Sequence, residues 1–186
     1  MTLLPFCEWL AATSGSIALH ESFYMYPLVE SAHVLTLCLF LGMTILWDLR
    51  LVGLALRSVK FSEMTDRLWP WMIGGFVLMS VTGVMLFYAI PVRSYQNIFF
   101  RIKVIALVLA GLNAWLFHTT AQRQVKSWES DPVPPKRARV AGATSLILWA
   151  VIVVSGRMIA YNWFDCDKQP QPAFLNWAAG CVTGPR

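Results

Sequence analysis

Apolar residues dominate four separate stretches of the chain, and polar residues dominate the segments between them. The apolar stretches run from about residue 24 to 47, 68 to 90, 99 to 119 and 140 to 163. A helix needs about 20 mostly apolar residues to cross a bilayer, and each stretch reaches that length. The pattern therefore predicts an all-α fold, an integral membrane four-helix bundle that forms a single domain over residues 1–186.

The two ends of the chain differ from the predicted spans. Residues 1–22 mix apolar and polar positions, and Pro5 stands where it suits a first helical turn. This segment is too short to span, so we expect a short amphipathic helix lying on the outer surface. Residues 164–186 are polar and rich in proline, and we expect an external tail in which Cys166 and Cys181 either form a disulfide or remain free thiols.

Composition supports the membrane assignment. Hydrophobic residues make up 57% of the chain and charged residues 13%, whereas a soluble domain carries about 25% charge. The net charge of +5 does not indicate nucleic-acid binding, because the basic residues are not interleaved with aromatic ones on one polar face. The sequence also lacks the C-x-x-C-H signature of covalently attached c-type haem.

Basic residues indicate the orientation of the bundle. They gather in the segments after the first and third spans, which lie on the same side of the membrane. Cytoplasmic loops carry an excess of Lys and Arg, so this side is predicted to be the inner one. Both termini are then external, which in a bacterial inner membrane means periplasmic. The inner residues are Arg50, Arg57, Lys60, Arg67, Arg123, Lys126, Lys136, Arg137 and Arg139.

His33 lies inside the first predicted span and is the main candidate for chemistry. An ionisable group at this depth is costly and usually faces a partner or a functional site. At 1.5 Å per residue, His33 lies about 9 Å to the outer side of the midplane. Arg157, Met85 and Met158 fall in the same layer, and Glu30 precedes His33 by one helical turn.

Three interpretations of His33 are open. It is an axial ligand of haem b, with Met85, Met158 or His20 opposite and Arg157 on a propionate. It belongs to a proton or substrate path with its charged neighbours. It is a structural histidine paired with a carboxylate.

Glu30 has a part in each of these interpretations. In the haem interpretation it orients the imidazole, as metal-bound histidines usually require. A copper or zinc site from His20, Glu21 and His33 is a further alternative, although no ligand-spacing signature supports it.

His118 lies at the inner end of the third span. The same depth arithmetic separates it from His33 by about 20 Å. Metal–nitrogen bonds are only about 2 Å long, so the two imidazoles cannot ligate one ion. His118 is therefore either an interfacial residue or the ligand of a second, inner haem. Asp48 and Arg50, also at the inner side, are expected to pair with interfacial charges.

Several short motifs carry a family resemblance. They are Glu21-Ser22, Tyr26-Pro27-Leu28-Val29-Glu30 with His33, Asp48 to Gly53, Phe100 to Lys103, Asn113, and Ser155 to Tyr161. With them the chain resembles a family of small bacterial four-helix membrane proteins of unknown function. The resemblance implies the four-span fold and points to Glu30, His33, Lys103 and Arg157.

The layout is also similar to that of b-type membrane cytochromes, which ligate haem through histidines on spanning helices. This is a likeness of architecture alone. Those proteins pair histidines at matched depth, and this chain does not. The difference favours His/Met or five-coordinate haem.

The sequence thus predicts a protein that binds haem b in the outer leaflet. It would pass electrons between the quinone pool or a membrane partner and a periplasmic redox protein. The alternatives are a non-catalytic subunit or scaffold with a structural Glu–His–Arg cluster, and a small transporter or proton path. Its surroundings are the lipid bilayer, and self-association or membership of a larger membrane complex is expected for so small a bundle.

Overall fold

The computed structural model describes residues 3–131, 133–161, 166 and 171–181. Four long helices dominate it, and each is long and apolar enough to cross a membrane. The chain is therefore an all-α, multi-pass membrane protein in contact with lipid, as predicted. The four helices are α3 (Met25–Val52), α4 (Phe61–Ala89), α6 (Ile98–Thr119) and α7 (Lys136–Tyr161).

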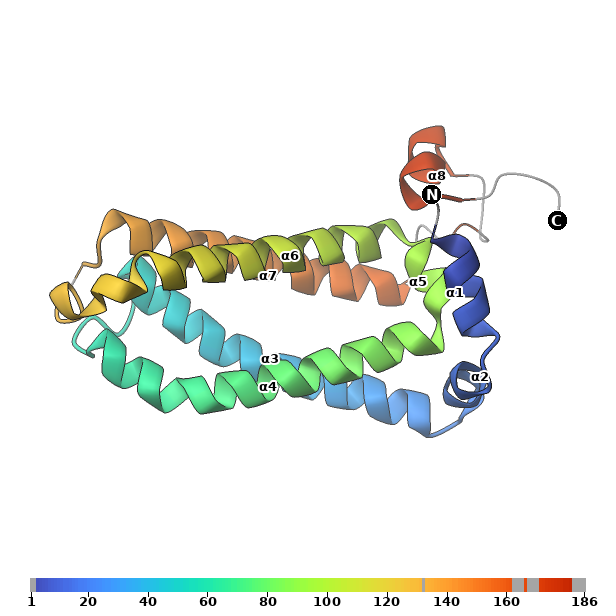
Figure 1. Ribbon diagram of the computed structural model, residues 1–186, viewed down its shortest axis with the longest axis horizontal. Coiled ribbons are helices and arrows are strands. Elements are labelled where there is room, and N and C mark those ends of the chain that lie inside the picture. The colour runs from blue at the N-terminus through green and yellow to red at the C-terminus, as the bar shows by residue number, and fades with distance from the viewer. Residues whose placement is uncertain (1–2, 132, 162–165, 167–170, 182–186) are drawn as a thin grey trace.

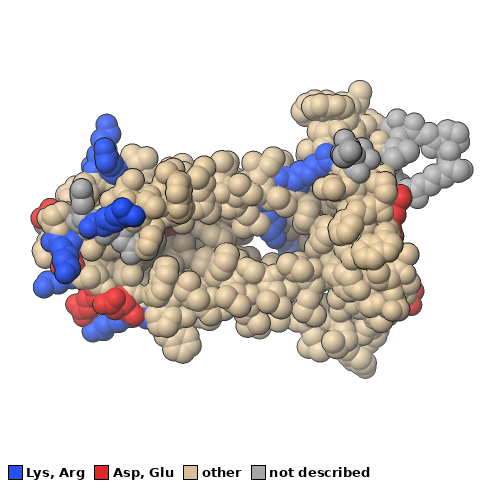
Figure 2. Space-filling view, viewed as in Figure 1, with Lys and Arg blue, Asp and Glu red and all other residues tan. Residues whose placement is uncertain are grey.

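The helices form two antiparallel pairs, α3 with α4 and α6 with α7, and α3 also packs on α7. Figure 1 shows the pairs meeting where α3 ends and α7 begins, and separating toward the end that carries both termini. We call the end with the termini the outer end and the opposite end the inner end. In the space-filling view the surface is hollowed between the pairs in the outer half (Figure 2).

Two of the spanning helices extend well beyond the apolar stretches at the inner end. α4 begins at Phe61, about two turns before the apolar residues, and α3 continues to Val52. The backbone hydrogen bonds of a helix can continue through polar residues beyond an apolar stretch. On the polar first turns of α4, Arg67 and Glu63 also form an ion pair of 2.8 Å. α3 then stops at Gly53, whose φ of 81° lies in the left-handed region that favours glycine.

Aromatic side chains close the inner end. Phe61 is 1% exposed, and its ring lies 5.3 Å from that of Trp47, 6.1 Å from Phe117 and 5.2 Å from Trp128. Trp128 follows a short 3₁₀ helix, η1 (Gln122–Ser127), in the connection between α6 and α7. These rings join three spanning elements and a loop, so this end of the bundle is a packed core.

At the outer end, the N-terminal segment forms two helices rather than the single one expected. These are α1 (Leu4–Ala11) and α2 (Ser14–Glu21). The break falls at Thr13, whose Oγ1 accepts from the backbone N–H of Ser16 and caps α2. Tyr88 at the end of α4 holds this corner, since its carbonyl accepts from Ser16 Oγ at 2.7 Å and its hydroxyl lies 2.8 Å from Thr13 Oγ1.

The C-terminal tail is fixed to the outer end as well. It contains a short helix, α8 (Ala173–Ala179), and the disulfide between Cys166 and Cys181 that the sequence left open. Arg101 of α6 donates to the carbonyls of Ala178 and Ala179 at 2.7 and 2.8 Å, and so holds the end of α8. The connection from α4 to α6 is the short helix α5 (Pro91–Tyr95).

Candidate functional site

His33 packs against α4 through the edge of its ring that carries Nδ1. Its Nδ1 lies 3.1 Å from the carbonyl oxygen of Met79 and 3.0 Å from Thr82 Oγ1. The Thr82 hydroxyl donates its own hydrogen to the carbonyl of Leu78 at 2.8 Å, so toward His33 it accepts. A carbonyl can only accept, and both contacts therefore place the proton on Nδ1.

That assignment leaves Nε2 of a neutral His33 with its lone pair. Among the residues that the structure describes, Nε2 has no hydrogen-bond partner. Metal-binding histidines typically donate their second ring N–H to a carbonyl or carboxylate, which fixes the tautomer and aims the other nitrogen. His33 has this arrangement, with the Met79 carbonyl in that role.

Gly83 makes room for the imidazole. A Cβ on this residue would lie 3.2 Å from Cε1 of His33, tighter than an ordinary contact. A larger residue at this position would press directly on the ring. Gly83 thus permits the close approach of α3 and α4 that lets Nδ1 reach the α4 backbone.

Lys103 of α6 lies at the same level in the other helix pair. Its Nζ is 3.5 Å from the position a Cβ would take on Gly156 of α7. Counted from the outer ends of their helices, these residues lie about 8–12 Å inward. We call this set, one residue from each spanning helix, the outer layer: His33, Gly83, Lys103 and Gly156.

Arg157 turns away from this layer. Its side chain is exposed, its Nη2 donates to the hydroxyl of Tyr161 at 2.8 Å, and the guanidinium lies 4.6 Å from the centre of that ring. Glu30 is also exposed, and both hydrogen bonds of His33 Nδ1 go to α4 instead. Glu30, His33 and Arg157 were grouped because of their similar predicted depth. These contacts do not bring their side chains together.

The two methionines lie near the outer layer. Met85 is two residues beyond Gly83 on α4, and Met158 is two beyond Gly156 on α7. Both are half-buried, and each is about 3 Å along its helix from the layer.

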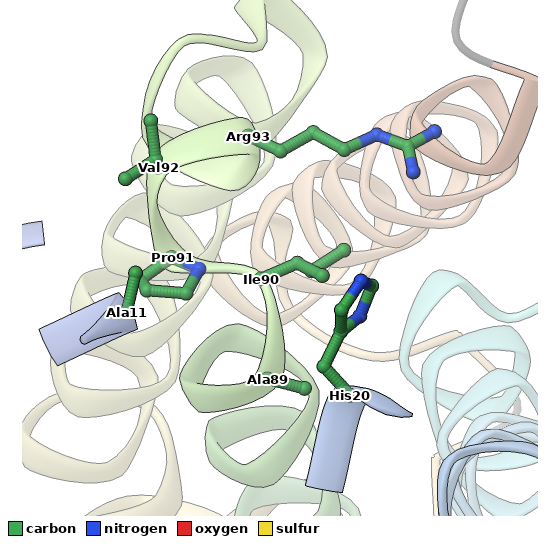
Figure 3. A pocket seen from close by; sticks show the side chains of 7 residues that line it. All are labelled: Ala11, His20, Ala89, Ile90, Pro91, Val92 and Arg93. Atoms are coloured by element: carbon green, nitrogen blue, oxygen red, sulfur yellow. The ribbon is translucent and has the colours of Figure 1, made fainter. Parts of the chain in front are cut away.

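His20 belongs to a different place. It lies in the last turn of α2 with an exposed side chain, and its ring makes an edge contact to that of Tyr26, 6.3 Å between centroids. It lines a pocket of about 270 Å³ at the junction of α4 and α5, shown in Figure 3. Ala89 in this pocket is about 9 Å along α4 from Gly83. The other lining residues are Ala11, Ile90, Pro91, Val92 and Arg93.

His118 stands at the far end of the bundle, in the last turn of α6. Its neighbour Phe117 contacts Phe61, whereas His33 contacts Met79. Those two α4 residues are about 27 Å apart along the helix axis, so the two histidines lie at opposite ends. Within the described ranges, no group of three or more His, Cys, Asp or Glu side chains forms a metal cluster.

Asp48 and Arg50 do not face the interface as expected. They are 1% and 0% exposed. Arg50 donates to the carbonyls of two inner loops, whereas Oδ2 of the Asp48 carboxyl has no hydrogen-bond partner among the described residues. Residues two apart on a helix point in different directions, so Asp48 does not share the contacts of Arg50.

Sequence reasoning missed the roles of Thr82, Gly83 and Gly156, since nothing along α4 or α7 shows which side of the helix meets an imidazole or an ammonium. Lys103 stood out only through the family motif. A cation within an apolar stretch was the available signal.

Comparison with known proteins gives a family and no activity. No curated protein and no solved structure matches the chain. The family described as a family of unknown function, DUF6644, matches residues 6–162, which include all four spanning helices from the first residue of α3 to the last of α7. The outer layer and the two buried charged residues of the inner end, Asp48 and Arg50, both lie inside this range. The chain therefore belongs to the DUF6644 family.

Proposed function

We propose that this protein binds haem b in the outer half of its helical bundle and transfers electrons there. His33 is the axial ligand. The observation that carries the proposal is the fixed tautomer of His33, whose Nδ1–H is held by Met79 and Thr82 while Nε2 keeps a free lone pair. This is the geometry of a histidine ready to bind a metal.

A single span histidine suits haem better than a bare metal ion. A porphyrin supplies four nitrogens to its iron and needs only one or two ligands from the protein, of which histidine and methionine are common. Met85 and Met158, two residues from the outer layer, are the candidates for the second position. A copper or zinc site from His20, Glu21 and His33 is less well supported, because His20 lines a separate pocket.

One observation supports the fit of such a group, namely the Nε2 lone pair of His33, which is unused among the described residues. Gly83 and Gly156 add no empty space, since the His33 ring and the Lys103 side chain lie 3.2 and 3.5 Å from the positions that their Cβ atoms would take. When bound, haem would supply a one-electron redox centre. The protein would position it near the outer surface, hold its ligand tautomer through α4 and exclude water with the apolar helices.

We place this function in the inner membrane of a bacterium, with both termini in the periplasm. The basic residues of the inner loops support that orientation, and Figure 2 shows Lys and Arg side chains gathered at that end. Electrons would pass between the quinone pool or a membrane partner and a periplasmic redox protein. A second copy or a larger complex would cover part of the exposed apolar surface. A second haem at His118 would extend the path to the inner side.

An absorption spectrum of the purified protein tests the proposal. We expect a Soret band that is lost in His33→Ala and retained in His118→Ala, the matched control at the other end of the bundle. A colourless wild-type protein, before and after incubation with haem, would overturn the proposal. A band that survives His33→Ala and disappears in His118→Ala would place the site at the wrong end.

A small transporter or proton path is the second candidate. It is favoured by one observation, the presence of the ionisable His33 and Lys103 side chains at a similar depth within two spanning helices. A colourless protein that acidifies proteoliposomes, with the activity lost in His33→Ala, would support it. The remaining alternative, a structural scaffold, predicts neither colour nor flux.

A further inference from the structure

A pocket lies on the flank of the bundle at the inner end, where the last turn of α3 meets the first turns of α7 (Figure 1). Its volume is about 390 Å³. Val52 of α3 forms one wall, about 28 Å along that helix from His33. The other lining residues are Lys136, Arg139, Val140 and Ala143 of α7. The pocket is therefore separate from the site at the outer end.

The basic and apolar residues of this pocket follow one another along one face of α7. The four α7 residues are spaced three, one and three positions apart, so they share a face of the helix. Lys136 and Arg139 stand nearest the inner end, and Val140 and Ala143 follow toward the middle of the membrane, all within a rise of about 10 Å. A phospholipid in a leaflet has the same order, with its headgroup at the surface and its acyl chains below.

Close helix packing forms the back of the pocket. A Cβ on Gly142 would lie 3.2 Å from Cγ2 of Val52 and 2.9 Å from the carbonyl oxygen of Asp48, so α3 and α7 cross here at short distance. The crossing separates the pocket from the interior of the bundle. Val140 on the opposite side is 55% exposed, and the pocket therefore opens to the outside.

The charge of the pocket is uncompensated. Lys136 and Arg139 are exposed, and neither has an ion pair or a hydrogen bond among the residues that the structure describes. The described residues that line the pocket include no acidic side chain. Asp48, on the same crossing, is 1% exposed and so is not on the surface that a ligand would meet. Basic pockets between spanning helices are typical of sites for anionic lipid headgroups.

We propose that this pocket binds one anionic phospholipid of the leaflet at the inner end. Lys136 and Arg139 donate to its phosphate, and an acyl chain lies along Val52, Val140 and Ala143. A free phosphate ion would contact only the two basic side chains and would leave the apolar part of the pocket unused. No covalent bond changes, and the inference depends neither on haem nor on which side of the membrane the inner end faces.

Competition between two lipids with the same acyl chains tests the site. The full-length protein would be incubated in detergent with equal amounts of dioleoyl phosphatidylglycerol and dioleoyl phosphatidylcholine, and native mass spectrometry would measure the bound ratio. We expect the wild type to prefer phosphatidylglycerol. Each basic residue near a lipid phosphate contributes about fivefold, so the double variant Lys136→Gln/Arg139→Gln should lower the preference roughly 25-fold. Arg123→Gln/Lys126→Gln removes the same charge from η1, outside the pocket, and should keep the preference.

A further variant separates a lipid from a free anion. Ala143→Leu keeps both charges but fills the apolar part of the pocket, so it should bind less phosphatidylglycerol than the wild type. Excess sodium phosphate at constant ionic strength should not displace the lipid. If phosphate displaces it, or if Ala143→Leu binds it as well as the wild type does, the lipid assignment is wrong.

The charge variants contain the remaining decisive outcomes. If both double variants lose the preference equally, binding reflects the general positive charge of the inner end, and the pocket is not a site. A wild-type protein without any preference would also overturn the proposal. The substituted basic side chains are exposed, so circular dichroism should show unchanged helix content in every charge variant.

Discussion

The two ends of the bundle use buried polar groups in opposite ways. At the inner end, Arg50 is fully buried, and its guanidinium donates to the carbonyls of Val59, Glu129 and Asp131 in two different loops. At the outer end, His33 and Lys103 are only half-buried, and Nε2 and Nζ have no partner among the described residues. The inner guanidinium is thus tied to two loops, although its Nη1 and Oδ2 of Asp48 have no hydrogen-bond partner among the described residues. The two outer groups are tied to no loop.

The packing around these groups differs in the same direction. Aromatic rings fill the inner end, where α3, α4 and α6 meet the loop that carries Trp128. In the outer layer there are two glycines, Gly83 and Gly156, and the polar side chains of His33 and Lys103 pack over them in place of aromatic rings. Cores stabilise a fold through dense packing, whereas binding sites need space and unpaired polar atoms. We infer that stability is concentrated at the inner end and ligand chemistry at the outer end.

Substitution of Arg50 should produce the largest effect. Arg50→Met removes hydrogen bonds that join both inner loops and leaves the carbonyls of Val59 and Asp131 without this donor, while the Glu129 carbonyl keeps the backbone N–H of Phe61. At about 1–3 kcal/mol for each unsatisfied group, we expect a loss of about 2–6 kcal/mol in unfolding free energy. Thermal unfolding in detergent, followed by circular dichroism, would measure it.

Arg50→Lys serves as the graded control. A lysine ammonium lacks the planar fork of the guanidinium and cannot bind the carbonyls of both loops at once. Arg50→Lys should therefore recover only part of the lost stability. If Arg50→Met unfolded at the wild-type temperature, the proposed difference in stability between the two ends would be wrong. It would also be wrong if Lys103→Met, at the outer end, lowered the unfolding temperature by as much as Arg50→Met.

Much of this fold could be predicted from the pattern of apolar residues, because length and hydropathy alone determine which segments can span. The pattern also separated His33 from His118, since helical rise converts position into depth. It could not show that Asp48 and Arg50 are buried, because charges at the end of an apolar stretch look alike whether they meet water or loop carbonyls. The loop carbonyls that bind Arg50 lie up to 81 residues away in the sequence.

The candidate site was predicted less completely. Depth placed Arg157 beside His33, but depth says nothing about direction around the helix axis, and Arg157 turns outward to Tyr161. The partner of Nδ1 is a backbone carbonyl, which every residue has and no sequence reveals. The break at Thr13 between α1 and α2 was missed because its capping hydroxyl also reads as an ordinary polar position.

An alanine at Gly142 should produce the second largest effect. Its Cβ would lie 2.9 Å from both the carbonyl oxygen of Asp48 and Cβ of Leu51, so α3 and α7 would have to move apart. Overpacking of this kind costs about 1–3 kcal/mol. Gly111→Ala is the matched control, because nothing lies within 4 Å of its Cβ position, and it should be neutral or stabilising. Equal unfolding temperatures for the two variants would mean that the inner crossing is not tightly packed.

An alanine at Gly83 should have the smallest effect on stability and a selective effect on the site. Its Cβ would meet Cε1 of His33 at 3.2 Å, so the ring must shift by a few tenths of an ångström and its bonds to Met79 and Thr82 lengthen. The higher helix propensity of alanine offsets this strain, and unfolding free energy should change by less than about 1 kcal/mol. Disturbing the groups that orient a metal-bound histidine typically costs 10–100-fold in affinity, and we expect haem binding to weaken by about tenfold or more.

Gly74→Ala provides the control on the same helix, since its Cβ position has nothing within 4 Å. It should leave both stability and haem titration close to those of the wild type. If Gly83→Ala lowered stability as much as Gly142→Ala, the outer layer would be a packed core like the inner end. If Gly83→Ala instead bound haem as the wild type does, the position of the His33 ring against α4 would not control ligand binding. A selective loss of affinity at unchanged stability is the result that separates an open site from a closed core.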